Sequence, residues 1–126
     1  MRPRSTTLTQ HELEIMKIVW QSGKATVRDV YEALLERRKI AYTTVMTTMK
    51  TLEDKGHLTH RAHAEDRAYV YEPTRPKKQV IGAMVQEFVN RVFDGSAEPL
   101  MVHLVKDRHL SKKGFAEITR MIRESE

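Results

Sequence analysis

Residues 41–56 read AYTTVMTTMKTLEDKG, and five of these residues are threonine. Threonine is a mediocre helix former, because its β-branched side chain loses rotamer freedom against the preceding turn. The apolar residues nevertheless recur at helical spacing and predict a helix from about Tyr42 to Lys55, ended by Gly56. One face of this helix is apolar and the opposite face is polar: the first carries Tyr42, Val45, Met49 and Leu52, and the second carries Thr43, Thr47 and Lys50. Thr48 lies at the edge of the apolar face, where packing or a hydrogen bond to a preceding carbonyl is expected.

Two further helices are predicted before this stretch. Thr9 and Glu12 have the spacing of a capping box at the start of the first helix, and Gly23 is a natural stop for it. Thr26 and Asp29 repeat the N-cap pattern at the start of the second helix. Apolar residues at helical spacing follow each cap, so each helix is expected to bury one face.

The sequence pattern changes after Gly56 from helical periodicity to something closer to alternation. The segments HLTHRA (57–62) and AYVYEP (68–73) are rich in β-branched and aromatic residues, and they flank a polar segment. They predict a β-hairpin with its tip near Glu65 and Asp66. Three helices followed by a hairpin, with a short connection between the second and third helices, is the element order of a winged helix-turn-helix.

Pro73 and Pro76 mark a boundary. Beyond it, residues 79–95 carry a broad apolar stripe, and two shorter amphipathic helices follow, in PLMVHLVKD (99–107) and, capped by Ser111, in KKGFAEITRMIRE (112–124). These helices have too little chain for a core of their own, because units below about 40 residues are usually marginal. We therefore expect a mainly α fold with a small β-hairpin wing: a winged-helix DNA-binding domain at residues 1–75 and a helical dimerisation module at residues 76–126.

The net charge of +5 is concentrated in the first part of the chain. Residues 1–80 hold 15 Lys and Arg against 10 Asp and Glu, whereas residues 81–126 hold 7 of each. A basic N-terminal module favours an anionic partner such as nucleic acid, although ordinary solubility charge would look similar. The chain has no apolar segment typical of a signal peptide and no apolar run near the roughly 18 residues of a membrane span, so a cytoplasmic protein is expected.

The threonine-rich helix has the residue types that suit the DNA major groove. Threonine side chains are thin enough to allow close approach, their hydroxyls can bond phosphates or bases, and their methyls can touch thymine; a lysine can reach phosphate or guanine. Cations in the hairpin could hold the DNA backbone beyond the groove. The predicted DNA-contacting residues are Tyr42, Thr43, Thr44, Met46, Thr47, Lys50 and Thr51 in the helix, and Arg61, His63 and Arg67 in the wing.

Enzymatic and metal chemistry find little support in the sequence. The absence of cysteine excludes disulfides, thiolate metal sites and cysteine nucleophiles. His57, His60 and His63 fall on a predicted strand, where positions three apart point to opposite faces. HELEI (11–15) is not the HExxH zinc motif, because position 15 is Ile. We therefore expect a protein that is not an enzyme and has no metal or other cofactor.

The stretch LTQHELEIMKIVWQSGKATVRDVYEALLERRKIAYTTVMTTMKTLEDKGHL (8–58) resembles the penicillinase repressor (BlaI/MecI) family of winged-helix transcriptional regulators. The similarity includes the first helix through Trp20, the TVRDV start of the second helix and the AYTTVMT start of the third, and it continues more loosely to the C-terminal helices. The resemblance implies a homodimer on a palindromic operator that represses genes often including a β-lactamase and a membrane receptor with a cytoplasmic zinc protease.

In the scheme that the resemblance implies, cleavage within the dimerisation module inactivates the repressor. The cleaved bond, typically asparagine-phenylalanine, would fall at His103 and Leu104, so this sequence departs from the family at that bond. Copper-responsive relatives carry C-terminal cysteines for the metal, and this chain has none.

Two alternatives to a DNA-binding repressor stay open from the residues. A winged-helix protein-interaction module is one, because a fold does not fix a function and acidic residues, among them Asp54, lie near the proposed DNA face. A small-molecule or metal-sensing regulator is the other, based on the three histidines and the apolar C-terminal helices.

Overall fold

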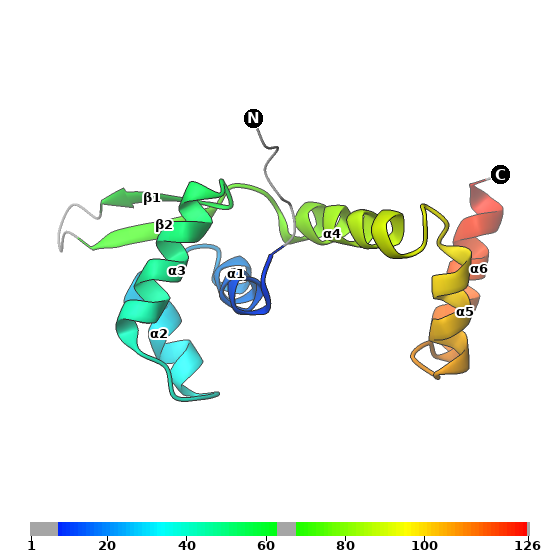
Figure 1. Ribbon diagram of the computed structural model, residues 1–126, viewed down its shortest axis with the longest axis horizontal. Coiled ribbons are helices and arrows are strands. Elements are labelled where there is room, and N and C mark those ends of the chain that lie inside the picture. The colour runs from blue at the N-terminus through cyan, green and yellow to red at the C-terminus, as the bar shows by residue number, and fades with distance from the viewer. Residues whose placement is uncertain (1–7, 63–67, 126) are drawn as a thin grey trace. The chain divides into compact units, whose positions relative to one another are not determined.

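The computed structural model describes residues 8–62 and 68–125 (Figure 1). The elements follow one another as α1 (Gln10–Ser22), α2 (Val27–Leu35), α3 (Tyr42–Asp54), β1 (Leu58–Ala62), β2 (Tyr69–Pro73), α4 (Lys77–Val92), α5 (Glu98–Lys106) and α6 (Lys112–Glu124). The chain forms two compact units, Met1–Met84 and Val85–Glu126, so that α4 contributes to both. No described helix combines the length and the apolar character that a bilayer crossing requires.

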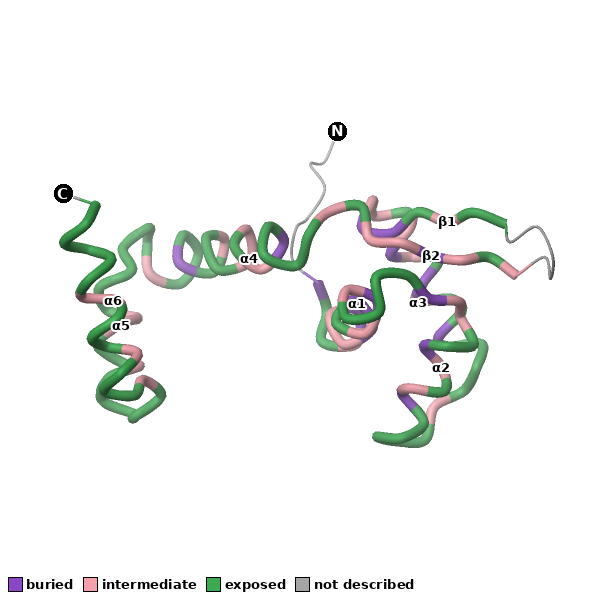
Figure 2. The backbone as a smooth tube through the Cα atoms, turned by 180° about the vertical axis from the view of Figure 1, so that it is seen from behind, coloured by how far each residue is buried: buried purple, intermediate pink, exposed green. Residues whose placement is uncertain are grey.

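The first unit is a winged helix-turn-helix, as predicted. Its core takes side chains from α1, α2, α3 and both strands, and Val80 at the start of α4 joins it. Figure 2 shows these buried positions on the inner sides of the helices and on the strands. The largest fully buried side chains are Ile15, Met16 and Val19 of α1, Val30 and Leu34 of α2, Val45, Met49 and Leu52 of α3, and Leu58 of β1.

The expectation that Tyr42 belongs to the buried face of α3 is wrong. Its side chain is 41% exposed, and its ring meets that of Tyr31 edge-on, with the ring centroids 5.3 Å apart. Helical periodicity gives the direction of a side chain but not its depth. Tyr42 lies in the first turn of the helix, and it is not among the side chains packed against the core.

Both predicted capping boxes are present. The Thr9 hydroxyl accepts a hydrogen bond from the Glu12 N–H at 3.1 Å, and the Glu12 carboxylate accepts one from the Thr9 N–H at 2.9 Å. Thr26 and Asp29 make the same reciprocal pair at the start of α2, with both bonds at 3.0 Å. Two of the otherwise unpaired N–H groups at each helix start are thereby satisfied.

The two strands form an antiparallel hairpin, which we call the wing. Leu58 pairs with Pro73, and Ala62 pairs with Tyr69 at the far end. Ala25, between α1 and α2, adds an isolated bridge to Tyr71, with hydrogen bonds in both directions at 2.8 and 2.9 Å. This bridge fixes the wing to the helical part of the unit. The predicted tip at Glu65 and Asp66 lies outside the described residues.

The C-terminal end of α3 is closed by Gly56, which has a φ of +88°. The N–H of Gly56 bonds the Glu53 carbonyl and the N–H of His57 bonds the Leu52 carbonyl, both at 2.9 Å, which is the Schellman arrangement. A residue with a side chain would be strained at this φ, so glycine suits the position. The chain then enters β1 after only one more residue.

One ion pair joins the start of α1 to the end of α3. The Glu12 side chain is 7% exposed, and the Lys55 ammonium lies 2.9 Å from both of its carboxylate oxygens. Burial alone would raise the pKa of Glu12, but the hydrogen bond from the Thr9 N–H and the Lys55 charge outweigh burial and lower this pKa below its ordinary value. The ionised form of Glu12 therefore stabilises the fold.

The three predicted C-terminal helices are present, and the second unit contains the end of α4 together with α5 and α6. The predicted N-cap Ser111 accepts a hydrogen bond from the Gly114 N–H at 2.9 Å. Neither α5 nor α6 has a buried residue, as Figure 2 shows. The Val105 and Phe115 side chains line the same two shallow cavities of about 290 and 310 Å³. The exposed large apolar side chains of this unit are Val85, Phe88, Val92, Val102, Val105, Phe115, Met121 and Ile122.

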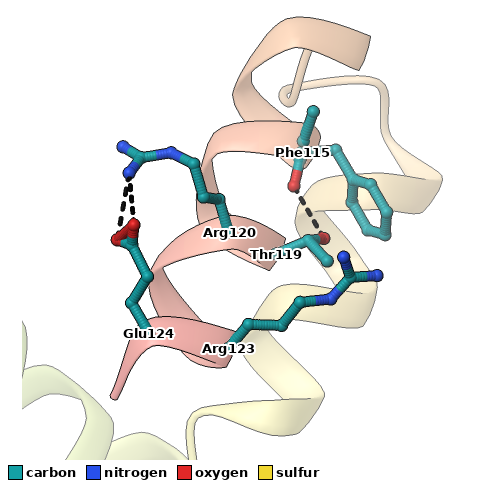
Figure 3. Close-up of a pocket in the computed structure, with 6 residues that line it drawn as sticks. Phe115, Thr119, Arg120, Arg123 and Glu124 are labelled. Carbon is teal, nitrogen blue, oxygen red and sulfur yellow. Dashed lines mark hydrogen bonds and ion pairs between the residues drawn. The ribbon is translucent and has the colours of Figure 1, made fainter. Parts of the chain in front are cut away.

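The helix α6 carries the Arg120–Glu124 ion pair and the Phe115 ring on different sides. Figure 3 shows Arg120 and Glu124 pointing to one side of the helix, while Phe115 and Arg123 point to the other. Arg120 donates to both Glu124 carboxylate oxygens at 2.9 and 3.0 Å. The exposed Phe115 ring is thus left on a face without this ion pair.

Replacing Glu12 by glutamine is expected to lower the free energy of unfolding by about 1–2 kcal/mol near neutral pH, because glutamine keeps the capping box but loses the ion pair. The pKa of Glu12 is lowered in the folded state, so its contribution is complete above the unfolded pKa of about 4.3 and is lost as the pH falls below it. The difference between wild type and variant should therefore shrink in acid. Urea denaturation of both proteins across this pH range measures it.

Glu124→Gln is the matched control, because it makes the same chemical change in the exposed pair with Arg120. Exposed pairs of this kind contribute about 0–1 kcal/mol, so its effect should be smaller. Equal losses in the two variants would contradict the stabilising role of the buried pair.

Candidate nucleic-acid interface

The polar face of α3 is exposed, as the sequence predicts. Thr43, Thr44 and Thr47 are exposed, and their hydroxyls make no hydrogen bond within the described parts of the chain. Together with Thr48 they line a shallow hollow of about 260 Å³. The opposite face of the same helix is fully buried in the core. The fold therefore presents a row of thin, polar side chains to the surroundings.

Two other threonines use their hydroxyls inside the helix. The Thr48 hydroxyl donates to the Thr44 carbonyl at 2.8 Å, which confirms the internal hydrogen bond predicted for it. The Thr51 hydroxyl donates to the Thr47 carbonyl at 3.0 Å in the same way. Such back-bonding occupies the hydroxyl hydrogen and leaves the oxygen as an acceptor. The DNA contact predicted for Thr51 stays a prediction, and its methyl group is the part best suited to it.

Lys50 supplies the positive charge of this face. It is exposed and has no ion pair among the described residues. Several other cations of the first unit are already paired, for example Arg28 with Glu32 at 3.6 Å and Arg38 with Glu14 at 2.6 Å. Lys50 is therefore available to neutralise an external anion without first breaking an internal contact.

A groove of about 780 Å³ runs along α3 between the start of α2 and the wing. Met46 and Tyr69, which are 46% and 54% exposed, give its walls an apolar part. Its lining comprises residues 26–29 at the start of α2, Tyr42, Met46, Lys50 and Glu53 of α3, and His60, Ala68, Tyr69 and Tyr71 of the wing. The groove thus joins the predicted contact residues Tyr42, Met46 and Lys50 to one side of the wing.

The wing carries Arg61 on its surface, where the Arg61 Nε lies 3.4 Å from a Glu72 carboxylate oxygen. Both side chains of this pair are exposed, and exposed ion pairs are weak. Arg61 can therefore leave Glu72 and bind a phosphate at little cost in free energy. His63 and Arg67, which were also predicted to contact DNA, lie outside the described residues.

The first turns of α2 and α3 differ in how their N–H groups are satisfied. The α2 start holds the Asp29 carboxylate in its capping box, and a carboxylate repels an incoming phosphate. The α3 start has Ala41 at the cap position, without a side-chain hydrogen bond. Free N–H groups and the positive end of the helix dipole favour an anion. Of these two helix starts, α3 is therefore the better suited to phosphate.

Sequence reasoning missed several residues of the groove, notably Arg28, Glu53 and Tyr69. The signal for Tyr69 was present, because Tyr69 and Tyr71 lie two apart on a strand and share a face. The signal for Glu53 was misleading, since an acidic side chain argues against a DNA-facing position. Its partner His60 becomes visible only when α3 and β1 are brought together.

No group of three or more histidine, aspartate or glutamate side chains is arranged to hold a metal ion in residues 8–62 and 68–125. His57 is buried, and His60 bonds Glu53, so these two histidines face different surroundings. His57 precedes β1, whereas His60 lies within it, so the expectation that both histidines fall on the strand is wrong for His57.

Three helices and a wing, with an exposed polar face on the third helix, define a winged helix-turn-helix protein of the kind found among transcription regulators. The penicillinase repressor family profile matches residues 8–124. The chain belongs to the penicillinase repressor family.

Individual relatives agree with this membership. The transcriptional regulator BlaI of Mycobacterium tuberculosis is 35% identical over 103 residues, which cover 80% of this chain and 73% of the relative. The penicillinase repressor of Bacillus licheniformis is 26% identical over 117 residues, covering 93% and 90%. The solution structure of monomeric Bacillus licheniformis BlaI in complex with the blaP half-operator is also similar, with a TM-score of 0.50, 26% identity and coverage of 62% of this chain and 92% of that one.

The two faces of α3 are expected to respond differently to the same substitution. Met49→Ala removes a fully buried side chain and should cost about 2–5 kcal/mol of unfolding free energy. Met46→Ala, at an exposed position one turn earlier, should cost less than about 0.5 kcal/mol. Chemical denaturation of the two variants measures the difference. Similar losses would show that the helix is rotated about its axis relative to the arrangement described above.

Proposed function

We propose that this protein is a homodimeric transcriptional repressor that binds a palindromic operator. In this proposal α3 enters the major groove and the wing contacts the DNA backbone. The observation that carries it is the exposed row of Thr43, Thr44 and Thr47 with Lys50 beside it, on a helix whose other face is fully buried. A repressor acts by occupying DNA and requires no catalysis, and we therefore propose no enzymatic role.

The chemistry of the α3 face supports base and phosphate contacts. Hydroxyl groups donate to or accept from base edges, and threonine methyls and Met46 can meet thymine methyls. Lys50 can bond phosphate or guanine. The relative bound to the blaP half-operator supports DNA as the ligand of this fold within the family. The proposed contact set keeps Tyr42, Thr51, Arg61, His63 and Arg67 from the sequence prediction.

The second unit supports the proposed dimer. Its three helical segments expose large apolar side chains, and α5 and α6 bury none within one chain. Covering apolar surface contributes about 25 cal/mol per Å². A second copy supplies a matching apolar face, since a two-fold interface uses the same patch on both subunits. We therefore propose residues 1–75 as the DNA-binding domain and 76–126 as the dimerisation module.

Dimerisation would make operator binding strong through two half-sites. Each α3 contributes few base contacts, and joining two of them makes the second binding event intramolecular. The genes controlled are proposed to include a β-lactamase or related functions. The repressor would act in the cytoplasm, where its operator DNA lies.

A membrane sensor zinc protease is the proposed source of induction. The bond between His103 and Leu104 lies within α5, and the His103 ring stands 6.4 Å from that of Phe93. Proteases prefer exposed, loosely held segments. Cleavage at this bond would therefore require α5 to unwind locally, which the absence of buried side chains in α5 makes easier.

Thr47→Glu is expected to abolish operator binding while leaving the dimer intact. The substitution places a long acid in the middle of the exposed face of α3, where it meets both the base edges and the phosphate charge. Gel shift assays with the promoter region of the chain's own operon, together with sedimentation, measure both properties. Wild-type affinity should also fall steeply with salt, because phosphate neutralisation releases counterions.

Lys113→Glu, on the exposed surface of α6, is the matched control and changes the net charge by a larger amount. It should bind the operator nearly as well as wild type. Sequence-specific binding retained by Thr47→Glu would refute the proposed groove helix. No shift by wild type even at low salt would instead favour a protein-interaction module.

Phe115→Glu is expected to shift the protein from dimer to monomer. The Phe115 side chain is 53% exposed and belongs to the apolar face of the second unit, so the proposed interface would have to bury the new charge. Sedimentation equilibrium and operator titration measure the outcome, with a loss of at least tenfold expected in operator affinity as avidity disappears. Lys113→Glu, which adds the same acid on another side of α6, should stay dimeric. A Phe115→Glu dimer would place the interface elsewhere.

A further inference from the structure

A hydrogen bond joins α3 to the wing. The His60 Nδ1 of β1 bonds a Glu53 carboxylate oxygen near the end of α3. Both side chains are partly exposed and line the groove that also contains Lys50. The bond therefore bridges the two elements that are proposed to touch DNA, at the level of the DNA-facing groove.

The His60 ring is held from its other sides by the second strand of the wing. Its centroid lies 4.4 Å from that of Tyr69 and 5.4 Å from that of Tyr71. Tyr71 is the residue paired with His60 across the hairpin, and it is also bonded to Ala25. The imidazole thus contacts two rings of β2, while its Nδ1 bonds Glu53 of α3. The position of this ring therefore depends on the angle between the wing and α3.

Glu53 places a negative charge in the groove between α3 and the wing. A carboxylate in a groove facing DNA repels phosphates, so by itself it lowers affinity. The other charged groups of the groove have different contacts: Arg28 pairs with Glu32, and Asp29 caps α2. Lys50, one turn before Glu53, has no ion pair among the described residues. The Glu53 carboxylate therefore bonds His60 and does not pair with Lys50.

We infer that Glu53 and His60 are positioning residues that set the wing against α3, so that the wing and Lys50 meet the DNA in one arrangement. The inference rests on the proposed function. When the bond is lost, the wing samples more orientations, and only a fraction of molecules is ready to bind. The apparent dissociation constant rises by the inverse of that fraction. Pre-organisation of this kind supplies affinity without adding a contact to the ligand.

Glu53→Gln gives a test in which charge repulsion and the positioning role predict opposite changes in operator affinity. The substitution keeps the shape of the side chain and removes a negative charge from the groove. Electrostatics alone predicts tighter operator binding, whereas weakening of the positioning bond, whose acceptor loses its charge, predicts weaker binding. We expect the dissociation constant to rise about three- to tenfold, because a hydrogen bond to a charged acceptor is stronger than one to a neutral amide. Fluorescence anisotropy with a labelled fragment of the chain's own promoter measures it.

Three further variants show whether His60 acts through Glu53. His60→Ala removes the bond and should weaken binding by at least the same factor, and the double variant with Glu53→Gln should be no weaker than His60→Ala alone, since both changes act on the same bond. His60→Asn, which keeps a side-chain amide near the Nδ1 position, should recover part of the affinity. His11→Asn is the matched control, because His11 also lies near a glutamate, Glu14, at 3.9 Å but outside the groove. Its binding should equal that of wild type.

Glu53→Asp retains the charge but has a shorter side chain that cannot reach His60 as well, so it too should weaken operator binding. This variant provides the test if Glu53→Gln proves unstable in thermal melts. Operator binding by Glu53→Gln that equals or exceeds wild type would overturn the inference. So would additive losses in the double variant, which would indicate an independent phosphate contact by His60. Failure of wild type to bind DNA would instead refute the proposed function, so the two failures are distinguishable.

Discussion

The complete burial of Val45, Met49 and Leu52 is the constraint on which the rest of the structure depends. These three side chains determine the rotation of α3 about its axis, because turning the helix would expose them and would leave cavities in the core. With the rotation fixed, the threonines and Lys50 have only one direction in which to point. The low helix propensity of threonine is tolerated because packing, rather than propensity, stabilises this helix.

The two ends of α3 are treated differently by the fold. Its last turns are held by several separate contacts: the Gly56 turn, the Lys55 bond to Glu12 and the Glu53 bond to His60. Its first turn has no side-chain cap, and Tyr42 lies exposed at the rim. Contacts at one end keep the helix in place, so the other end can leave its polar groups available for a ligand. The contacts that stabilise α3 and the polar groups that are available to a ligand thus lie at opposite ends of a helix of 13 residues.

Local patterns in the sequence predicted most of the fold. Capping boxes, helical periodicity and the change to alternation after Gly56 gave the helices and the wing, because each depends on residues close in the chain. The depth of Tyr42 could not be predicted, since it depends on where neighbouring helices end. The Glu53 bond to His60 and the Lys55 bond to Glu12 join different elements, so no local pattern indicates them. The same holds for the groove, whose lining comes from α2, α3 and the wing.

The two units differ in the physical state of their apolar surfaces. The first unit closes its core within one chain, with at least nine of its described side chains fully buried, whereas α5 and α6 bury none. An element without buried contacts opens locally at little free-energy cost. A signal that acts on the second unit can therefore separate the proposed dimer without disturbing α3 or the wing. Because affinity for a palindrome depends on both copies being joined, loss of the junction alone would release the DNA. The helices α5 and α6 are thus the part of the chain where a regulatory change requires the least free energy.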